Sequence, residues 1–413
     1  MSTYTPINEL SVGIDFGDGP RKVGRLAHRD GLTYFEYDAL FQNAGLNISP
    51  IRLPVEPGLK SFDPHVFEGL PGVFDDSLPD GWGRLLFDRL LRSKGMLAGD
   101  ISPLDRLAHV GQTGIGALVY EPDHSGKPKG GILNLDALAA QTIEVLSGEA
   151  DDVLEELLTL NGSSAGARPK AVIGVDKARE TIRYAEEALP KGYEHWLVKF
   201  GSTTDGPDAG AIEYVYSLMA KEAGIEMMPT HLFPGQNSAG YFATQRFDRN
   251  EGQRFHTHTA CGLLHSDFRT PSLDYEDLLT LTEVVTRDVR EVKKMFRLAV
   301  FNVLAHNRDD HSKNFTFMMD SSGEWRLSPA YDLTFSSGPN GEQSTMIMGA
   351  GKNPSVDDLT KLGHAANISK ADIDGVIGQT KHALNKWTDL AKEFGVRSKT
   401  VKLVSTAIKD STT

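Results

Sequence analysis

The chain has 413 residues, with 39% hydrophobic and 24% charged residues and a formal net charge of −13. This length exceeds what one hydrophobic core usually serves, so we expect two or three packed units. The acidic balance argues against direct nucleic-acid binding, because contact with phosphate backbones needs clustered Lys and Arg. The single cysteine, Cys261, excludes an internal disulfide framework and fits a reducing compartment. We expect it to be a small buried side chain rather than a nucleophile.

The N-terminus and the apolar runs carry no pattern of secretion or membrane insertion. The first residues read MSTYTPINELSVGIDFGDG, without the cationic stretch and apolar run of a secretory signal. The most apolar segments, such as MFRLAVFNVLA, contain Arg297 and Asn302 and are too short to span a bilayer. The sequence therefore predicts a cytoplasmic protein with no membrane segment.

An N-terminal unit is predicted for residues 1–122. It begins with strand-like runs and glycine turns, and continues with a helix in SLPDGWGRLLFDRLLRSKG, a short helix in DRLAHVG and a strand in ALVYE. Its segment VGIDFGDG is similar to the first phosphate loop of actin-like sugar kinases, but the further motifs of that fold are missing. We interpret it as a strand and hairpin turn. The polar run EPDHSGKPKGG marks the end of the unit.

Two further units are predicted beyond this boundary. Residues 123–248 hold two helices, the second ending at Gly162, and then the loop SSAGARPK, the strands AVIGV and WLVKFGS, the helix AIEYVYSLMAKEAGI and the strand GYFATQRFDR. This is the order of a kinase small lobe. Helical patterns such as DVREVKKMFRLAVFNVLAHN and KHALNKWTDLAKEFG dominate residues 249–413. We expect an α+β, bilobal, protein-kinase-like fold with a mixed small lobe, a mostly helical large lobe and an N-terminal β-rich subdomain.

The run HNRDDHSKNFTFMMDSSGEWRLSPAYDLT carries the most specific chemical pattern. Asp309 is followed five residues later by Asn314, then by a predicted hairpin and by Asp332. Phosphoryl transfer needs these parts in this order: a carboxylate to orient the attacking hydroxyl, an amide oxygen for Mg²⁺, and a second carboxylate to hold the metals against the phosphates. The hairpin would bring the two metal ligands together. A helix end followed by a solvated turn is the alternative interpretation.

A kinase also needs a lysine on a small-lobe strand and a helix glutamate that orients it. Lys199 lies among apolar neighbours in WLVKFGS, where a charge is costly without a partner. Glu213 on the next predicted helix is available as that partner, with a solvated surface acid as the alternative. The small residues of SSAGARPK would let backbone N–H groups approach phosphate oxygens, although the loop is neither a Walker A nor a GxGxxG loop. A flexible linker is the alternative there.

Several histidines and a lysine near these motifs are candidates for binding zinc or the nucleotide phosphates. His256 and His258 alternate along an extended stretch, but Cys261 does not complete a zinc site with them, so structural zinc is not expected. We interpret His311 and Lys313 as polar catalytic-loop residues near the γ-phosphate, with solvation at the surface as the alternative.

Eight segments of the chain resemble the HipA family of bacterial toxin kinases. They span roughly residues 65–335 in the family's order and read FEGLPGVFDDSLPDGWGRLLFDRLL, DRLAHVGQTGIGALVY, SSAGARPKA, WLVKFGS, IEYVYSLMAKEAGI, QRFDR, RDDHSKNF and LSPAYDL. The resemblance implies ATP and Mg²⁺ as cofactors and Asp309 as the catalytic base. It further implies Asn314 and Asp332 as Mg²⁺ ligands, and Lys199 as the lysine that contacts the ATP phosphates.

The resemblance also implies how the nucleotide is held. Gln245 and Phe247 would offer backbone hydrogen bonds to adenine, and Asp248 would reach the ribose. Ser163 would be an autophosphorylated serine whose modification ejects the loop and silences the kinase, since a dianion cannot share the anion site with ATP. The loop differs from the family, which often has Gln and Glu before the lysine, and its serine is doubled, so Ser163 and Ser164 are alternative phosphosites. The loop residues expected at the phosphates are Ser164, Ala165, Gly166, Ala167 and Arg168.

Together these features predict an ATP- and Mg²⁺-dependent serine/threonine-protein kinase that modifies a cytoplasmic protein. The resemblance implies an aminoacyl-tRNA synthetase as the class of target, and self-inactivation by autophosphorylation. It also implies a toxin–antitoxin system in which a HipB-like DNA-binding antitoxin would hold the protein on operator DNA. Two alternatives remain open: a small-molecule kinase of the aminoglycoside phosphotransferase type, which uses a similar Asp and Asn loop, and a catalytically idle regulator that binds a partner.

Overall fold

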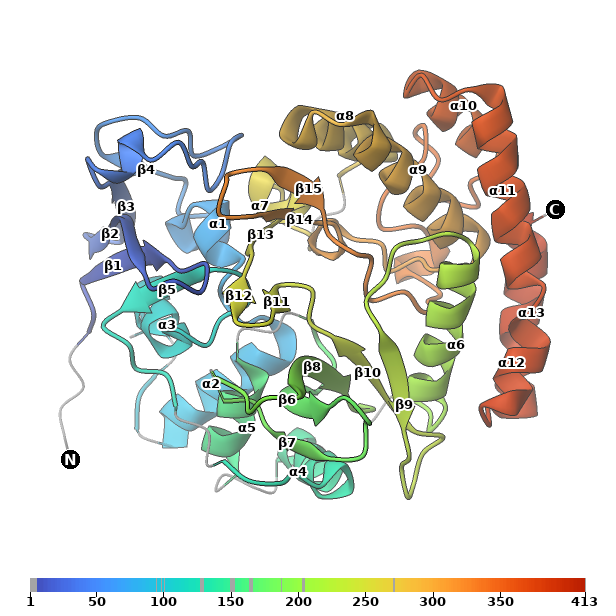
Figure 1. Cartoon of the computed structure of the whole chain (residues 1–413), viewed down its shortest axis with the longest axis horizontal. Coiled ribbons are helices and arrows are strands. Elements are labelled where there is room, and N and C mark those ends of the chain that lie inside the picture. Colours follow the sequence, from blue (N-terminus) through green and yellow to red (C-terminus); the bar gives the residue numbers. More distant parts are fainter. Residues whose placement is uncertain are drawn as a thin grey trace.

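The computed structural model of the protein describes residues 6–93, 95–97, 99, 101–126, 130–148, 153–162, 166–186, 188–202, 205–269 and 272–412. It contains an N-terminal sheet, a second sheet with flanking helices, and a mostly helical C-terminal part whose last helices run along one side (Figure 1). Within the described residues, no helix has both the length and the apolar character that a membrane crossing requires.

The N-terminal sheet has five strands in the order β4-β3-β2-β1-β5, and each neighbouring pair is antiparallel. Alternate residues of β1, namely Leu10, Val12 and Ile14, are buried, as expected for a strand with one covered face. Asp15 accepts hydrogen bonds from two backbone N–H groups in the turn to β2, which confirms the predicted strand and hairpin turn. The strands are β1 (Glu9–Ile14), β2 (Arg21–Arg29), β3 (Leu32–Tyr37), β4 (Lys60–Ser61) and β5 (Leu118–Glu121).

The helices of the N-terminal unit pack in two directions. They are α1 (Gly72–Asp75), α2 (Gly81–Ser93) and α3 (Pro103–Val110). α3 begins with a capping box between Ser102 and Asp105 and packs against the N-terminal sheet. α2 instead buries Trp82, Leu86 and Leu90 in one cluster with α5 and the second sheet. Residues on both sides of the predicted boundary at residue 122 therefore share this core.

The second sheet also has five strands, in the antiparallel order β7-β6-β8-β10-β9. Its register places Lys170 of β6 opposite Lys199 of β8. α6 packs against β9 and β10, and α5 packs against β6. The elements predicted for a small lobe are β6 (Lys170–Asp176), β8 (Tyr193–Lys199), β10 (Tyr241–Gln245), α4 (Leu135–Ser147), α5 (Leu154–Asn161) and α6 (Ala209–Glu222). The sheet also contains β7 (Ile182–Tyr184) and β9 (Thr230–Phe233), which the sequence analysis did not predict.

The C-terminal part is mostly helical and contains the predicted hairpin as β14 and β15 of a three-stranded sheet with β13. Its strands are β11 (Arg249–Asn250), β12 (Gln253–Arg254), β13 (His256–Thr259), β14 (Thr316–Met319) and β15 (Trp325–Leu327). Its helices are α7 (Ala260–Leu264), α8 (Tyr275–Thr286), α9 (Val289–Leu304), α10 (Val356–Ala365), α11 (Lys370–Leu384), α12 (Trp387–Glu393) and α13 (Ser398–Thr412). The single helix predicted for KHALNKWTDLAKEFG is thus divided between α11 and α12.

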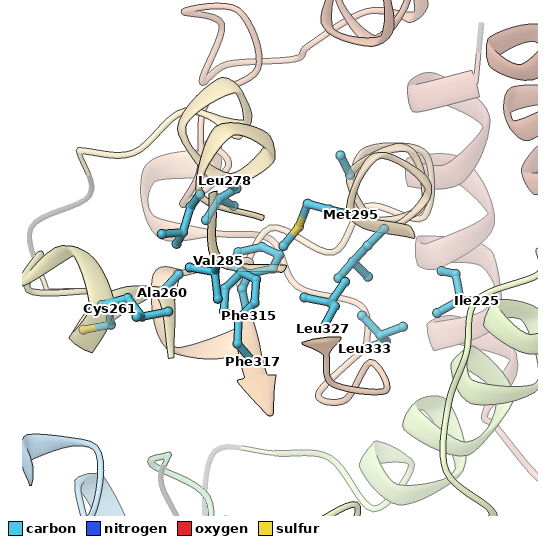
Figure 2. Close-up of a cluster of buried hydrophobic side chains, with 14 of the residues drawn as sticks. Ile225, Ala260, Cys261, Leu278, Val285, Met295, Phe315, Phe317, Leu327 and Leu333 are labelled. Carbon is cyan, nitrogen blue, oxygen red and sulfur yellow. The ribbon is translucent and has the colours of Figure 1, made fainter. Parts of the chain in front are cut away.

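A buried apolar cluster fixes the hairpin against the large helices. Figure 2 shows Phe317 and Leu327 of the hairpin in this cluster with Leu278 of α8 and Met295 of α9. Cys261 lies in the same cluster, and burial raises the pKa of its thiol to about 12. The prediction of a small buried side chain at this position is confirmed.

The C-terminal helices hold α6 at both of its ends (Figure 1). At the N-terminal end, Arg397 Nε lies 2.9 Å from an oxygen of Asp208, the residue that precedes α6. At the other end, Lys386 Nζ lies 2.7 Å from Oε1 of Glu222. Gln379 of α11 also donates a 3.0 Å hydrogen bond to the backbone oxygen of Glu222. The helix is therefore fixed to the large lobe as well as to its own sheet.

Candidate active site

Three charged side chains predicted from separate motifs meet between the second sheet and the large lobe. Lys199 ends β8, Glu213 lies on α6, and Asp332 follows β15. Lys199 Nζ is 2.5 Å from Glu213 Oε1 and also donates to Asp332 Oδ1. The Lys199 and Glu213 side chains are 10% and 3% exposed. Burial opposes the charge on Lys199, but Asp332 and Glu213 together raise the pKa of its ammonium.

The catalytic-loop residues also lie close to one another. Asp309 follows α9 and its side chain is 58% exposed. Asn314, in a 3₁₀ turn at Ser312–Asn314, donates a 2.7 Å hydrogen bond from Nδ2 to the backbone oxygen of Asp309. This bond uses the amide nitrogen, so the amide oxygen is the atom that can act as a ligand. The loop therefore presents a solvent-accessible carboxylate beside a fixed amide.

Arg168 shows that these two groups of residues share one site. Its guanidinium is 3.3 Å from Asp205 and 4.0 Å from Glu213. Against the effect of burial, the carboxylates of Glu213, Asp205, Asp332 and Asp309 raise the pKa of Arg168. The acids predicted for metal binding and for proton transfer therefore lie near enough to act on one cation of the predicted phosphate loop, which contacts Asp205 and Glu213 directly.

The neighbouring Asp310 has a structural function in the same loop. It is buried and accepts hydrogen bonds from Tyr275 Oη at 2.8 Å and from the backbone N of Ser344 at 2.9 Å. Asn302 on α9 donates to the same tyrosine oxygen, at 3.0 Å. Burial raises the pKa of Asp310 to about 6, although its hydrogen-bond donors act in the opposite direction. Of the two consecutive aspartates, one is thus anchored in the core while the other faces solvent.

The predicted phosphate loop is described from Gly166 onward. Ser163, Ser164 and Ala165 lie outside the described residues. Gly166 donates its backbone N–H to Asp80, and Arg168 belongs to the acidic cluster described above. Ala167 lies close to Gly81, because a Cβ built on Gly81 would come within 2.6 Å of the Ala167 Cα. The loop thus contacts the N-terminal unit.

Lys170 is a site residue that the motif analysis missed. It is buried opposite Lys199, and its Nζ lies 2.5 Å from where a Cβ on Gly166 would be. Burial, with the charge of Lys199, lowers the pKa of Lys170 to about 8. Its position at the end of SSAGARPK, directly before a strand, was the signal that could have revealed it. Two lysines therefore lie opposite each other on adjacent strands, and one of them, Lys170, faces the phosphate loop.

The predicted hinge is ordered by contacts of its own. The Gln245 N–H donates to the Pro229 oxygen at 2.9 Å, so its carbonyl is the group that can bind adenine. The Phe247 ring stacks on Tyr331, with centroids 5.6 Å apart. The Asp248 side chain is only 3% exposed and accepts bonds from Arg246, Arg249 and the Gly116 N–H. Asp248 therefore joins the hinge to the N-terminal unit, and its expected contact with the ribose stays a prediction.

His311 lies beside the predicted catalytic base Asp309, whereas Lys313 contacts the N-terminal unit. His311 Nε2 is 4.0 Å from the Asp309 carboxylate, consistent with a place at the catalytic loop. Lys313 is 7% exposed, and its Nζ lies 3.2 Å from Asp80 and 3.5 Å from Asp75. Its ammonium therefore pairs with acids of the N-terminal unit, a contact that local sequence does not reveal, and its place near the γ-phosphate stays a prediction.

The oxygen donors of the site suit Mg²⁺. Asn314 offers an amide oxygen, and Asp332 a carboxylate that is 30% exposed. Although burial opposes it, the charges of Lys199 and Lys170 lower the pKa of Asp332, which keeps this carboxylate ionised. Within the described residues, no three His, Cys, Asp or Glu side chains converge as a metal site. His258 is instead held between Asp76 and Ser49, at 2.6 Å and 3.0 Å.

Fold and site together define a bilobal kinase-like protein with an N-terminal β-rich subdomain. Two family models match it: HipA N-terminal domain over residues 18–121, and HipA-like C-terminal domain over residues 162–388. The second match alone covers more than half of the 413 residues. The chain therefore belongs to the HipA family, as the motifs predicted.

Two known proteins show the extent of this likeness. A Sinorhizobium fredii protein named "Putative kinase Y4mE" is 24% identical over 261 residues, which are 60% of this chain and 55% of that protein. The match thus spans about half the length of that curated relative. A chain of the solved Shewanella oneidensis toxin–antitoxin complex of HipA, HipB and operator DNA aligns with a TM-score of 0.67 at 16% identity, covering 97% of this chain and 96% of that one. The second likeness confirms the fold.

Proposed function

We propose that this protein is an ATP- and Mg²⁺-dependent kinase that phosphorylates a serine or threonine of another protein. The observation that carries the proposal is Lys199, whose ammonium contacts both Glu213 and Asp332. A lysine held by a helix glutamate and facing a metal-binding carboxylate is the arrangement that kinases use to fix the ATP phosphates. Family membership and the relative named as a kinase support the same activity.

Each side chain has a defined part in this reaction. The attacking hydroxyl oxygen bonds to the γ-phosphorus, the bond to the β–γ bridging oxygen breaks, and ADP leaves. The hydroxyl proton passes to Asp309, whose exposure lets a substrate reach it. Lys199 would contact the α- and β-phosphates, with Glu213 fixing its direction. When bound, Mg²⁺ neutralises phosphate charge, with Asn314 and Asp332 as its protein ligands.

The target and partner follow from the same family. A carboxylate that is 58% exposed suits a protein segment better than an enclosed small molecule, and an aminoacyl-tRNA synthetase is the target class we propose. We propose a HipB-like antitoxin as partner, supported by the fold shared with the HipA–HipB–DNA complex. With a net charge of −13, association with DNA would depend on that partner. Autophosphorylation at Ser163 or Ser164 would then silence the enzyme in the cytoplasm.

The test is transfer of labelled γ-phosphate from ATP with Mg²⁺. Asp309→Asn should slow transfer by about 10²-fold or more, because a general base contributes that much. Asp389→Asn is the matched control, since Asp389 is exposed on α12, and it should leave transfer unchanged. Equal transfer by wild type and Asp309→Asn would refute the proposal.

Two extensions of this experiment assign the phosphosite and the acceptor. Self-labelling of Asp309→Asn at the wild-type level would contradict autophosphorylation, whereas loss only in Ser163→Ala or only in Ser164→Ala identifies the serine. Offering aminoacyl-tRNA synthetases and aminoglycosides as acceptors separates a protein kinase from a small-molecule kinase. Labelling of the aminoglycoside alone would overturn the protein-kinase assignment.

A further inference from the structure

The segment 75–82 of the N-terminal unit contacts both loops of the proposed active site. The Asp80 carboxylate accepts a hydrogen bond from the Gly166 N–H of the phosphate loop through Oδ1. Its other oxygen, Oδ2, lies 3.2 Å from Lys313 Nζ of the catalytic loop. Asp75 Oδ2 lies 3.5 Å from the same ammonium. One carboxylate therefore joins two loops that are far apart in sequence.

The contact with the phosphate loop is reinforced by the backbone. The Trp82 N–H donates to the Gly166 oxygen at 3.1 Å, so Gly166 is held through both its N–H and its C=O. Gly81 lies between the two bonding residues with φ near +45°, and a Cβ there would come within 2.6 Å of the Gly166 oxygen. The absence of a side chain at this position allows the close approach.

Burial makes these contacts energetically significant. Asp80 and Lys313 are both buried, with side chains 11% and 7% exposed. A charged group in such a place is costly unless its partners remain, so removal of either side chain leaves the other unpaired. The Lys313 ammonium pairs with the carboxylates of both Asp75 and Asp80. Asp80 uses only one of its oxygens in this pair, so its other oxygen can accept the Gly166 N–H. These distances describe one connected unit rather than separate surface ion pairs.

We propose that Asp80 is a positioning residue that holds the phosphate loop, through Gly166, at a fixed place relative to the catalytic loop, through Lys313. The N-terminal unit would thereby set the affinity of the kinase lobes for ATP. This inference rests on the proposed function for its effect on ATP. Its structural part, the restraint of Gly166 by Asp80, is independent of any activity.

The structural part is tested by hydrogen–deuterium exchange in peptides that contain Gly166, with the full chain and no nucleotide. A hydrogen bond to a charged group is worth roughly 10- to 100-fold in an equilibrium, so Asp80→Ala should accelerate exchange at Gly166 by about that factor. Glu68→Gln is the matched control, because Glu68 is an acid of the same unit that pairs only with Arg84 and Arg106 among the ion pairs described, and it should leave this exchange unchanged. Unchanged exchange in folded Asp80→Ala would overturn the proposal.

The functional part is tested by steady-state kinetics with ATP. Asp80→Ala should raise KM for ATP by about tenfold or more while kcat falls less, since the loop binds phosphate but Asp309 and its hydroxyl acceptor are untouched. A loss of kcat with unchanged KM would overturn it. If Asp80→Ala does not fold, Asp80→Asn carries both measurements, because its single acceptor oxygen cannot serve both the Gly166 N–H and the Lys313 ammonium, so the link between the two loops is broken. Absence of transfer in the wild type would refute the proposed function alone, because the exchange result still decides whether Asp80 restrains Gly166.

Discussion

The two five-stranded sheets of this protein have the same size and the same antiparallel pairing, yet they bury different residues. The N-terminal sheet covers the apolar Leu10, Val12 and Ile14 of its first strand. In the second sheet, Lys170 is buried and lies opposite Lys199, whose side chain is 10% exposed, on the adjacent strand. A sheet of ordinary architecture therefore becomes a candidate active site when two cations are placed at the end of its strands.

The cations of the second sheet are tolerated because other elements bring carboxylates to them. Glu213 lies on α6 and Asp332 follows β15, the second strand of the hairpin, and both pair with Lys199. Two buried like charges on neighbouring strands would otherwise destabilise the sheet. The N-terminal sheet instead buries apolar side chains of β1, which stabilise it by leaving water. The difference predicts that changes in one sheet affect activity and changes in the other affect stability.

The largest expected effect comes from Lys199→Met. Loss of the ammonium removes an electrostatic contact to phosphate and leaves two carboxylates unpaired, so kcat/KM for phosphate transfer should fall by about 10²- to 10³-fold. Lys22→Met is the matched control, because Lys22 is an exposed lysine on β2 of the N-terminal sheet. Steady-state assays measure kcat/KM of both variants. An equal loss of kcat/KM in the two would show that the second sheet has no special part in activity.

A smaller effect, on stability rather than on activity, is expected for Val12→Ala. Val12 is fully buried in β1, and removing two methyl groups there should lower the free energy of unfolding by roughly 2 kcal/mol. Denaturant titration measures this change, while kcat/KM of the folded variant should stay at the wild-type value. Leu40→Ala, at a residue that is 85% exposed, should change stability far less. A selective loss of kcat/KM in Val12→Ala would contradict the assignment of the N-terminal sheet to stability.

The smallest effect is expected for Lys170, and it depends on pH. Burial lowers the pKa of this lysine to about 8, so its ammonium is charged below that pH and becomes neutral as the pH rises through it. The neutral side chain no longer attracts the anionic nucleotide, so wild-type kcat/KM for ATP should decline as the pH rises above about 8. Lys170→Met should show a value about tenfold lower below pH 8, without that decline. An identical pH profile in wild type and variant would show that Lys170 takes no part.

Local sequence predicted the parts of the site that lie within short motifs. The spacing of Asp309 and Asn314, the hairpin after them, and the lysine inside an apolar strand are all visible in a few residues. The structure brings the first two together at 2.7 Å through the Asp309 backbone oxygen, and pairs Lys199 with Glu213. Their roles in catalysis stay predictions.

Contacts between distant segments could not be predicted in the same way. Lys313 pairs with Asp80, which precedes it by 233 residues, and the charge pattern around Lys313 alone gives no sign of that partner. Asp248 reads as a polar hinge residue, but two arginines and the Gly116 N–H enclose it. α2 was likewise placed in the N-terminal unit by chain order, while its apolar face packs into the core of the second sheet. In each case the deciding interaction is tertiary.

The attachment of α6 at both ends bears on how the proposed kinase could be regulated. Many kinases are switched by a rotation that withdraws the helix glutamate from its lysine. Here such a rotation would have to break the ion pair of Asp208 with Arg397 and that of Glu222 with Lys386 together. These contacts favour the position in which Glu213 pairs with Lys199. A regulator of the proposed kinase therefore has a second place to act, the phosphate loop, where the N-terminal unit supplies the restraint through Asp80.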